Sequence, residues 1–199
     1  NYSAAHGSLV IEDDFENEFV YLQKPTPSLF GLAGGQNVVY LGTFSRLLLP
    51  SIRISFMVLP PELSALYRKK ADQYNQTASK AEQIALCQFI RDGHLAAQTR
   101  KLKRLYSVKL KALRSAVREV FGKDAQIQTG AAGTSLALTL STTLTWQELQ
   151  KKAQTNGLRL QLLREAPGKI TLILSCSSMP VADFVPACKL LKDISQIQN

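Results

Sequence analysis

The chain has 199 residues, of which 45% are hydrophobic and 20% are charged, a balance typical of a globular protein and unlike that of a disordered one. No apolar run approaches the ~20 residues that a transmembrane helix needs. The formal net charge of +9 leaves two interpretations open, a nucleic-acid partner or one exposed basic helix. The second is favoured, because no recognition motif accompanies the charge.

The cysteines and the first residues of the chain indicate its setting. Cys87, Cys176 and Cys188 form no CxxC pair and lack metal-ligand spacing, which predicts reduced thiols in a cytoplasmic protein. The opening NYSAAHGSLVIEDDFENEF turns acidic almost at once, unlike a signal peptide. Because a buried-type strand begins so early and no initiator methionine precedes it, we expect a fragment of a longer protein.

The beginning of the sequence is predicted to form strands. Apolar and β-branched runs predict them over residues 8–14, 37–43 and 53–60. The run at 8–14 ends in carboxylates, as a buried parallel strand does at its C-terminal edge. Residues 24–35 are predicted to form a loop, because they are rich in Pro and Gly.

Between Pro61 and Gly122 the apolar residues change to helical spacing. The last helix, predicted over residues 94–122, has one apolar stripe made of Leu95, Leu102, Leu105, Leu110, Leu113, Val117 and Val120. Eight basic residues alternate with it: Arg100, Lys101, Lys103, Arg104, Lys109, Lys111, Arg114 and Arg118. They are interpreted as the solvated face of a long helix, because no aromatic interleaving or glycine loop supports nucleic-acid recognition.

The second half of the chain is predicted to be a small α+β layer in the order β-α-β-β-α. Strands are predicted over residues 134–141, 158–163 and 169–175. Thr145 with Glu148 three residues later predicts a capping-box helix between the first two strands. A terminal helix follows, with a kink expected at Pro186.

Polar residues at two strand ends are candidates for chemistry. The carboxylates that end the strand at 8–14 need a cation, either a protonated ring nitrogen of a ligand or an arginine of the protein, and the residues alone favour the arginine. Thr43, Ser45 and Arg53 suit an anionic ligand, because they offer charge-assisted hydrogen bonds. The sequence has no GxGxxG, P-loop, HExxH or GxSxG motif, and no metal site is predicted.

Taken in order, these segments resemble fold-type-I pyridoxal-phosphate enzymes, and more specifically the aminotransferase-like domain of MocR-type regulators in the GntR superfamily. VIEDDFENEF is similar to the family's EDDYDSEF, PTPSLFGL to its PLPSLQGL, and VVYLGTFSRLLLPSIRISFMVLP to its VIYLGTFSKTLAPGLRLGYLVAP. The helix pair EQIALCQFIRDGHLAAQTRKLKRLY and the strand GAAGTSLALTL follow in the family's order. The resemblance covers nearly the whole chain.

The resemblance implies a fold that is α/β in its first part and α+β in its second. Residues 1–93 would form the C-terminal part of the large, cofactor-binding domain, a mixed sheet flanked by helices. Residues 94–199 would form a long connecting helix and a small C-terminal domain.

The resemblance also implies roles for individual residues. Asp13 matches the aspartate that pairs with the pyridinium nitrogen of the cofactor, and Phe15 stands where a tyrosine usually binds its phenolic oxygen. The phosphate side of the motif is matched by Thr43, Ser45 and Arg53. Arg46 falls at the Schiff-base lysine.

Three departures from the family's pattern argue for a degenerate site. Arg46 stays protonated at physiological pH and cannot do the covalent chemistry of a lysine. Phe15 removes a second polar contact, and the strand KITLILSCSS lacks the arginine with which the family commonly binds a substrate carboxylate. Arg46 is instead expected to pair with Asp13 or with a bound phosphate.

These residues predict a non-catalytic domain of a cytoplasmic bacterial transcription regulator, which senses an effector or holds a homodimer. The effector would be a small molecule such as an amino acid, and pyridoxal 5'-phosphate would bind noncovalently in a pocket that this chain leaves incomplete. DNA would be bound only through an upstream winged-helix domain outside this chain, and no membrane partner is expected. The alternative is an active class I/II aminotransferase, which needs another lysine such as Lys24.

Overall fold

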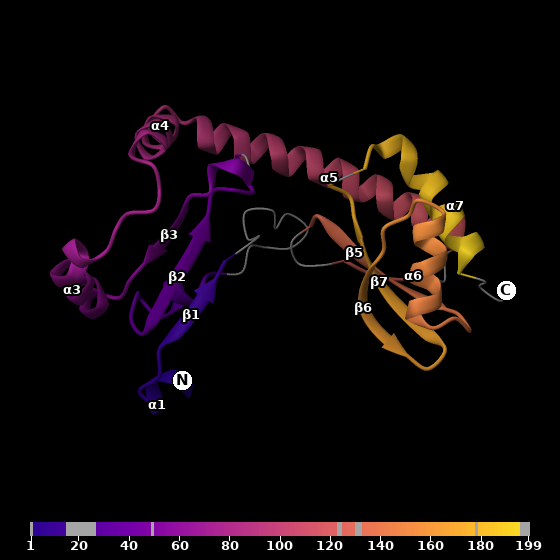
Figure 1. Ribbon diagram of the computed structural model, residues 1–199, viewed down its shortest axis with the longest axis horizontal. Coiled ribbons are helices and arrows are strands. Elements are labelled where there is room, and N and C mark those ends of the chain that lie inside the picture. The colour runs from indigo at the N-terminus through magenta and orange to yellow at the C-terminus, as the bar shows by residue number, and fades with distance from the viewer. Residues whose placement is uncertain are drawn as a thin grey trace. The chain divides into compact units, whose positions relative to one another are not determined.

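The computed structural model describes residues 2–14, 27–48, 50–122, 125–129, 133–177 and 179–195 (Figure 1). The described residues form two compact units, one up to Leu102 and one from Lys103 onwards. This division falls within helix α5 (His94–Phe121), whereas the sequence suggests a boundary at the start of that helix. The domain ranges 1–93 and 94–199 stay a prediction.

The first unit contains a three-stranded sheet in the order β1 (Val10–Asp13), β2 (Val38–Thr43) and β3 (Ser55–Val58). β1 is parallel to β2, and β3 is antiparallel to β2. The three predicted strands and the mixed sheet are therefore confirmed. The helices of this unit are α1 (Tyr2–Ala5), α2 (Leu29–Leu32), α3 (Pro61–Lys70), α4 (Lys80–Arg91) and the first part of α5, with 3-10 helices η2 (Pro50–Ile52) and η3 (Ala71–Gln73).

Aromatic rings cover one face of this sheet. The ring of Tyr40 lies 6.3 Å from that of Phe30 and 6.2 Å from that of Phe56, and the rings of Phe44 and Phe56 are 5.2 Å apart. Phe56 pairs with Gly42 across the strands, and a Cβ atom at position 42 would come within 2.4 Å of its ring. A side chain at Gly42 would therefore displace this ring.

The carboxylate of Glu12 fixes the short helix α2 to the sheet. Its two oxygens accept hydrogen bonds from the backbone N–H groups of Leu29, at 2.8 Å, and Phe30, at 2.9 Å. These N–H groups lie in the first turn of α2, where no helical carbonyl is available to them. Ser28 caps the same turn through the N–H of Gly31. The predicted loop therefore contains an anchored helical turn.

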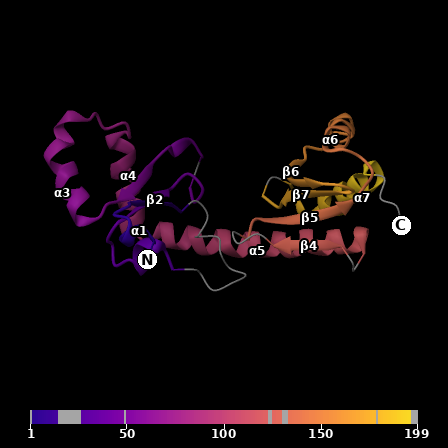
Figure 2. The same cartoon turned by 90° about the horizontal axis from the view of Figure 1, so that it is seen from below.

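The second unit contains an antiparallel sheet in the order β4-β5-β7-β6, which Figure 2 shows. Its strands are β4 (Gln126–Thr129), β5 (Ser135–Ser141), β6 (Gln161–Ala166) and β7 (Lys169–Ser175). Its helices are the rest of α5, α6 (Trp146–Thr155) and α7 (Phe184–Ile194), which the 3-10 helix η4 (Val181–Asp183) precedes. The sequence analysis missed β4, because QIQT holds a single apolar residue and becomes a strand only by pairing with β5.

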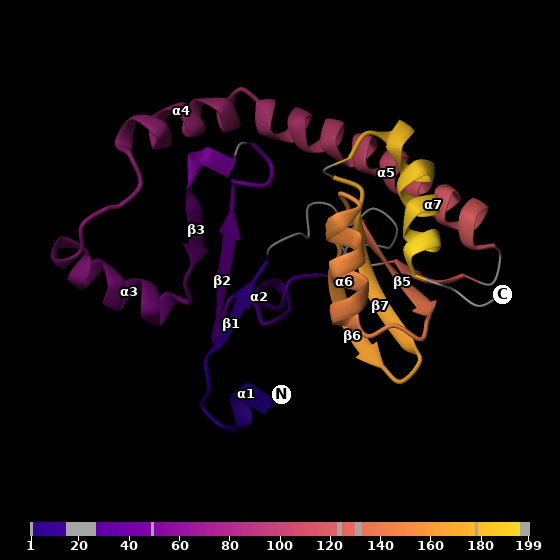
Figure 3. The same cartoon turned by 45° about the vertical axis from the view of Figure 1, so that its right-hand side comes forward.

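The core of the second unit lies between this sheet and its helices. Leu136, Leu138 and Leu140 of β5 project from one face, and Leu172 of β7, which pairs with Leu138, joins them. The same cluster contains residues of α5, α6 and α7, namely Leu113, Val117, Leu149, Phe184 and Leu191. Figure 3 shows α6 and α7 side by side. All three helices therefore contribute to one core.

Three details of the sequence analysis are wrong. Pro186 lies in the first turn of α7 and not in the middle of a helix. A backbone N–H in the first turn has no acceptor within the helix, so the proline costs α7 no hydrogen bond. Leu105 is 50% exposed and is not part of the buried stripe of α5. β6 begins at Gln161, three residues later than predicted, and carries an irregularity in its pairing with β7 between Leu162 and Arg164.

Among the described helices, none has an apolar stretch long enough to cross a bilayer.

Candidate functional site

The parallel pairing of β1 with β2 brings predicted site residues together. Asp13 ends β1 opposite Leu41, and Thr43 ends β2 two residues further on. Since neighbours in register point to the same face and side chains alternate along a strand, Asp13, Leu41 and Thr43 share one face. This face is opposite to that of the aromatic rings, although Phe56 also borders the cavity that lies here. All three residues line a cavity of about 770 Å³.

The three carboxylates at the end of β1 are used differently. Glu12 holds α2, and Asp14 accepts a hydrogen bond of 2.6 Å from the hydroxyl of Tyr40. The exposed side chain of Asp13 has no hydrogen bond or ion pair with another described residue, so the expected pairing with Arg46 is not seen. Asp13 is therefore the carboxylate available to a cation in the cavity.

The segment after β2 forms a tight turn. The hydroxyl of Thr43 accepts from the N–H of Ser45 at 3.3 Å and lies 3.4 Å from the carbonyl oxygen of Ile54. The N–H of Leu48 donates to the carbonyl of Phe44, which gives the turn helical geometry. Ser45 is half-buried and Arg46 is exposed. Hydroxyls and N–H groups at such a strand end suit an anion.

Arg53 adopts a strained backbone conformation. Its φ angle is +43°, in the left-handed region that residues other than glycine rarely occupy. Strain of this kind costs of order 1–3 kcal/mol and clusters at functional sites. Its side chain is exposed, and Ser55, two residues later, pairs with Thr43 and lines the same cavity. The strain at Arg53 is thus consistent with a constrained role beside the turn.

Two predicted or suggested site residues, Phe15 and Lys24, lie outside the described residues. The sequence analysis did not single out Ser55 and Tyr67, which also line the cavity. Ser55 could have been found as the single polar residue that follows Arg53 in the strand predicted over residues 53–60. No local signal places Tyr67 there, since it comes from α3 and reaches the cavity through tertiary packing.

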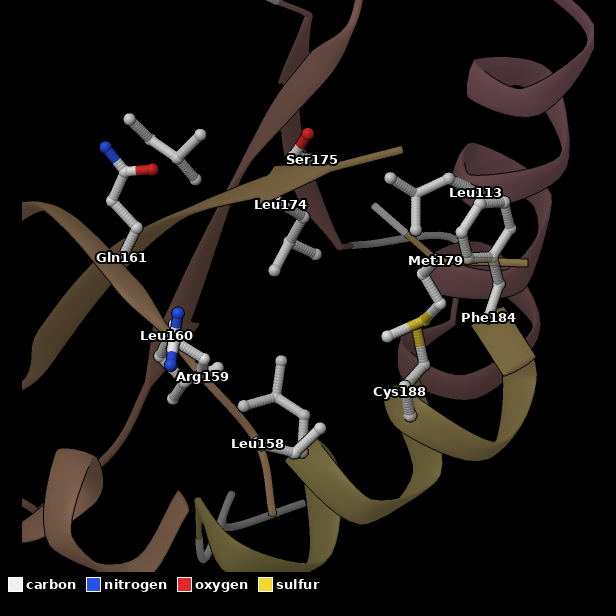
Figure 4. A pocket seen from close by; sticks show the side chains of 13 residues that line it. Leu113, Leu158, Arg159, Leu160, Gln161, Leu174, Ser175, Met179, Phe184 and Cys188 are labelled. Carbon is white, nitrogen blue, oxygen red and sulfur yellow. The ribbon is translucent and has the colours of Figure 1, made fainter. Parts of the chain in front are cut away.

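A second cavity, of about 500 Å³, lies within the second unit and contains none of the predicted site residues (Figure 4). Its lining is mostly apolar, with Leu158 and Met179 among the labelled side chains. It also includes Cys188, whose pKa burial raises to about 11, with Glu119 acting in the same direction. A thiol with so high a pKa is not a nucleophile at neutral pH.

The two units together have the fold of pyridoxal-phosphate-dependent aminotransferases. The structure matches LysN, the α-aminoadipate aminotransferase of Thermus thermophilus, with a TM-score of 0.78 over 98% of this chain and 52% of that chain. The sequences are 24% identical, so this match shows the fold alone. LysN was crystallised with N-(5'-phosphopyridoxyl)-L-leucine. The predicted α/β and α+β fold is confirmed.

The relatives found by sequence are mainly transcriptional regulators. The chain is 32% identical over 195 residues to the HTH-type transcriptional regulator YdeL of Bacillus subtilis and 30% identical over 158 residues to the probable rhizopine catabolism regulator MocR of Rhizobium meliloti. These alignments cover 96% and 79% of this chain, but only 42% and 32% of the two relatives. No family model matches the chain. The chain is thus homologous to MocR-type transcriptional regulators over most of its length, as the resemblance indicated.

The residues present fit part of a pyridoxal-phosphate site. The carboxylate of Asp13, which has no partner among the described residues, suits a protonated ring nitrogen in the cavity, and the turn at Thr43 and Ser45 suits a phosphate. The side chain of Arg46 does not suit covalent attachment of the cofactor, because a protonated guanidinium has no nucleophilic amine. The described residues therefore fit noncovalent binding.

Proposed function

We propose that this chain is the non-catalytic, effector-sensing and dimerisation part of a bacterial MocR-type transcription regulator. The observation that carries the proposal is the arginine at position 46 in the turn after β2, which by the family resemblance stands where the Schiff-base lysine is expected. A guanidinium stays protonated, so it neither attacks a carbonyl nor moves a proton at neutral pH.

The remaining residues would hold the cofactor by charge. Bound pyridoxal phosphate supplies an electron-withdrawing ring. Asp13 would keep the ring nitrogen protonated, while Thr43, Ser45 and Arg53 would bind the phosphate and Arg46 would add a further cation. Strand β7 carries no arginine for a substrate carboxylate, which also favours sensing over turnover.

The setting of the domain is part of the same proposal. The chain spans less than half the length of the regulators described above, so the activity of the whole protein is inferred from the family. We infer a cytoplasmic homodimer that binds a small-molecule effector, such as an amino acid or the cofactor. A winged-helix domain would bind the operator DNA.

Reduction with borohydride in the presence of pyridoxal phosphate tests this proposal. With one equivalent of pyridoxal phosphate, we expect peptide mass spectrometry to find no single lysine of the wild-type chain labelled in preference to the other exposed lysines, and a dominant adduct at position 46 in Arg46→Lys. A dominant adduct at one lysine of the wild type would contradict the absence of a Schiff base, and amino-group exchange with a panel of amino acids would establish the active aminotransferase instead. Asp13→Asn is the matched variant for noncovalent binding, and it should weaken cofactor affinity measured by fluorescence.

A further inference from the structure

Helix α5 carries most of the net positive charge of the chain. Its 28 residues include eight Lys and Arg residues and one carboxylate, Glu119, whereas the whole chain has a net charge of +9. Four exposed residues of its second-unit part form what we call the basic stripe: Arg104, Lys111, Arg114 and Arg118. At 3.6 residues per turn they fall within an arc of about 80° around the helix axis.

Packing holds the basic stripe on the outer face of the helix. Leu110, Leu113 and Val117 are buried in the core of the second unit, so the helix is not free to rotate. Lys109 differs from the stripe, because its ammonium group donates to the carbonyl oxygen of Ser177 at 3.2 Å. Within the described residues, the four side chains of the stripe make no ion pair or hydrogen bond.

The order of charges along the stripe is unfavourable for an isolated helix. Lys111 and Arg114 are three residues apart and Arg114 and Arg118 are four apart, so like charges are neighbours on the surface. Glu119 is rotated by about 100° from Arg118 and does not interrupt the row. A row of cations without carboxylates is complementary to a polyanion.

We propose that the basic stripe binds the phosphate backbone of duplex DNA, independently of base sequence. From Arg104 to Arg118 the helix rises about 21 Å, which matches about six base pairs at 3.4 Å each. This inference rests on the proposed function, since it takes DNA as the partner of a transcription regulator. The proposal differs from the expectation, stated in the sequence analysis, that DNA is bound only through a winged-helix domain.

Fluorescence anisotropy with a labelled 30-base-pair duplex of arbitrary sequence tests the proposal on the 199-residue chain. If each of the four residues neutralises one phosphate, the logarithm of the association constant falls with the logarithm of the salt concentration with a slope of about −3.6. The triple variant R104Q/K111Q/R118Q should reduce the magnitude of this slope by about 3.

A matched control removes the same charge elsewhere. The variant K69Q/K70Q/K151Q changes exposed residues of α3 and α6 and should keep the wild-type slope. Circular dichroism checks that both variants are folded. No DNA binding by the wild type in 20 mM salt, or equal weakening in both variants, would overturn the proposal.

Binding to phosphatidylglycerol vesicles without binding to the duplex would also overturn it, because the stripe would then recognise a lipid surface. The borohydride experiment is independent of all these outcomes. A failure of DNA binding is therefore distinguishable from a failure of the proposed function.

Discussion

At the scale of single residues, strand alternation decides what each carboxylate of β1 does. Glu12 points to the aromatic face and fixes α2, whereas Asp13 points to the opposite face and lines the cavity with Thr43. Arg46 follows Thr43 by three residues, and under the proposed function this one position separates covalent chemistry from binding by charge.

Cys188 gives a pH-dependent prediction at this scale. Burial raises its pKa from 9.0 to about 11, so the unfolded chain loses the thiol proton first as the pH rises. Its contribution to the free energy of unfolding is complete below pH 9 and is lost as the pH rises towards 11. We expect the stability difference between wild type and Cys188→Ala to fall by about 2 kcal/mol over this range.

Urea unfolding at several pH values measures this difference. The matched control is Cys87→Ala, which removes an exposed thiol and should follow the pH profile of the wild type. Parallel profiles for wild type and Cys188→Ala would contradict the prediction.

At the scale of elements, the N-terminus of helix α6 is held both by residues next to it in the sequence and by a residue of strand β6. Thr145 and Glu148 make the predicted capping box, which is confirmed. These hydrogen bonds from the backbone and side chain of Thr145 hold the pKa of Glu148 below its ordinary value. Glu165 of β6 adds a hydrogen bond from the N–H of Trp146, at 2.8 Å. The start of α6 is thus fixed both locally and by the sheet.

Thr145→Ala should destabilise the second unit by about 1 kcal/mol, because two hydrogen bonds of the cap lose their side-chain partner. Trp146 is the single tryptophan of the chain, so its fluorescence during urea unfolding reports on this unit. Thr145→Ser keeps the hydroxyl and should stay close to wild type. Equal stability of all three proteins would show that the cap contributes nothing.

At the scale of the whole molecule, the buried apolar residues are distributed unequally. Among the described residues, fifteen buried hydrophobic residues belong to the second unit and five to the first. In the first unit, every residue of β3 is exposed and α3 buries none. The two units should therefore differ in stability.

Hydrogen exchange measured by mass spectrometry tests this difference. We expect the amides of β1 to β3 to exchange before those of β5 and β7, because apolar burial supplies most of the stability of a unit. Leu172→Ala should cost about 2–5 kcal/mol and lower protection in the second unit alone. Val39→Ala should act on the first unit alone, and loss of protection throughout the chain in either variant would contradict two separate units.

The sequence predicted most elements correctly, because their signals are local. Helical spacing indicated α5, and the Thr145 capping box indicated α6. The prediction failed where tertiary contacts determine the structure. β4 forms a strand through its pairing with β5, and Leu105 is exposed although it fits the apolar spacing of the helix.

The sequence by itself indicated the resemblance to MocR-type regulators, most of the strands and helices in their order, and the arginine at position 46, since each is written in contiguous residues. Only the tertiary structure decided that Asp13, rather than Glu12 or Asp14, faces the cavity with Thr43. The reason is that the register of β1 against β2 sets the face of every side chain, and a shift by one residue would reverse it.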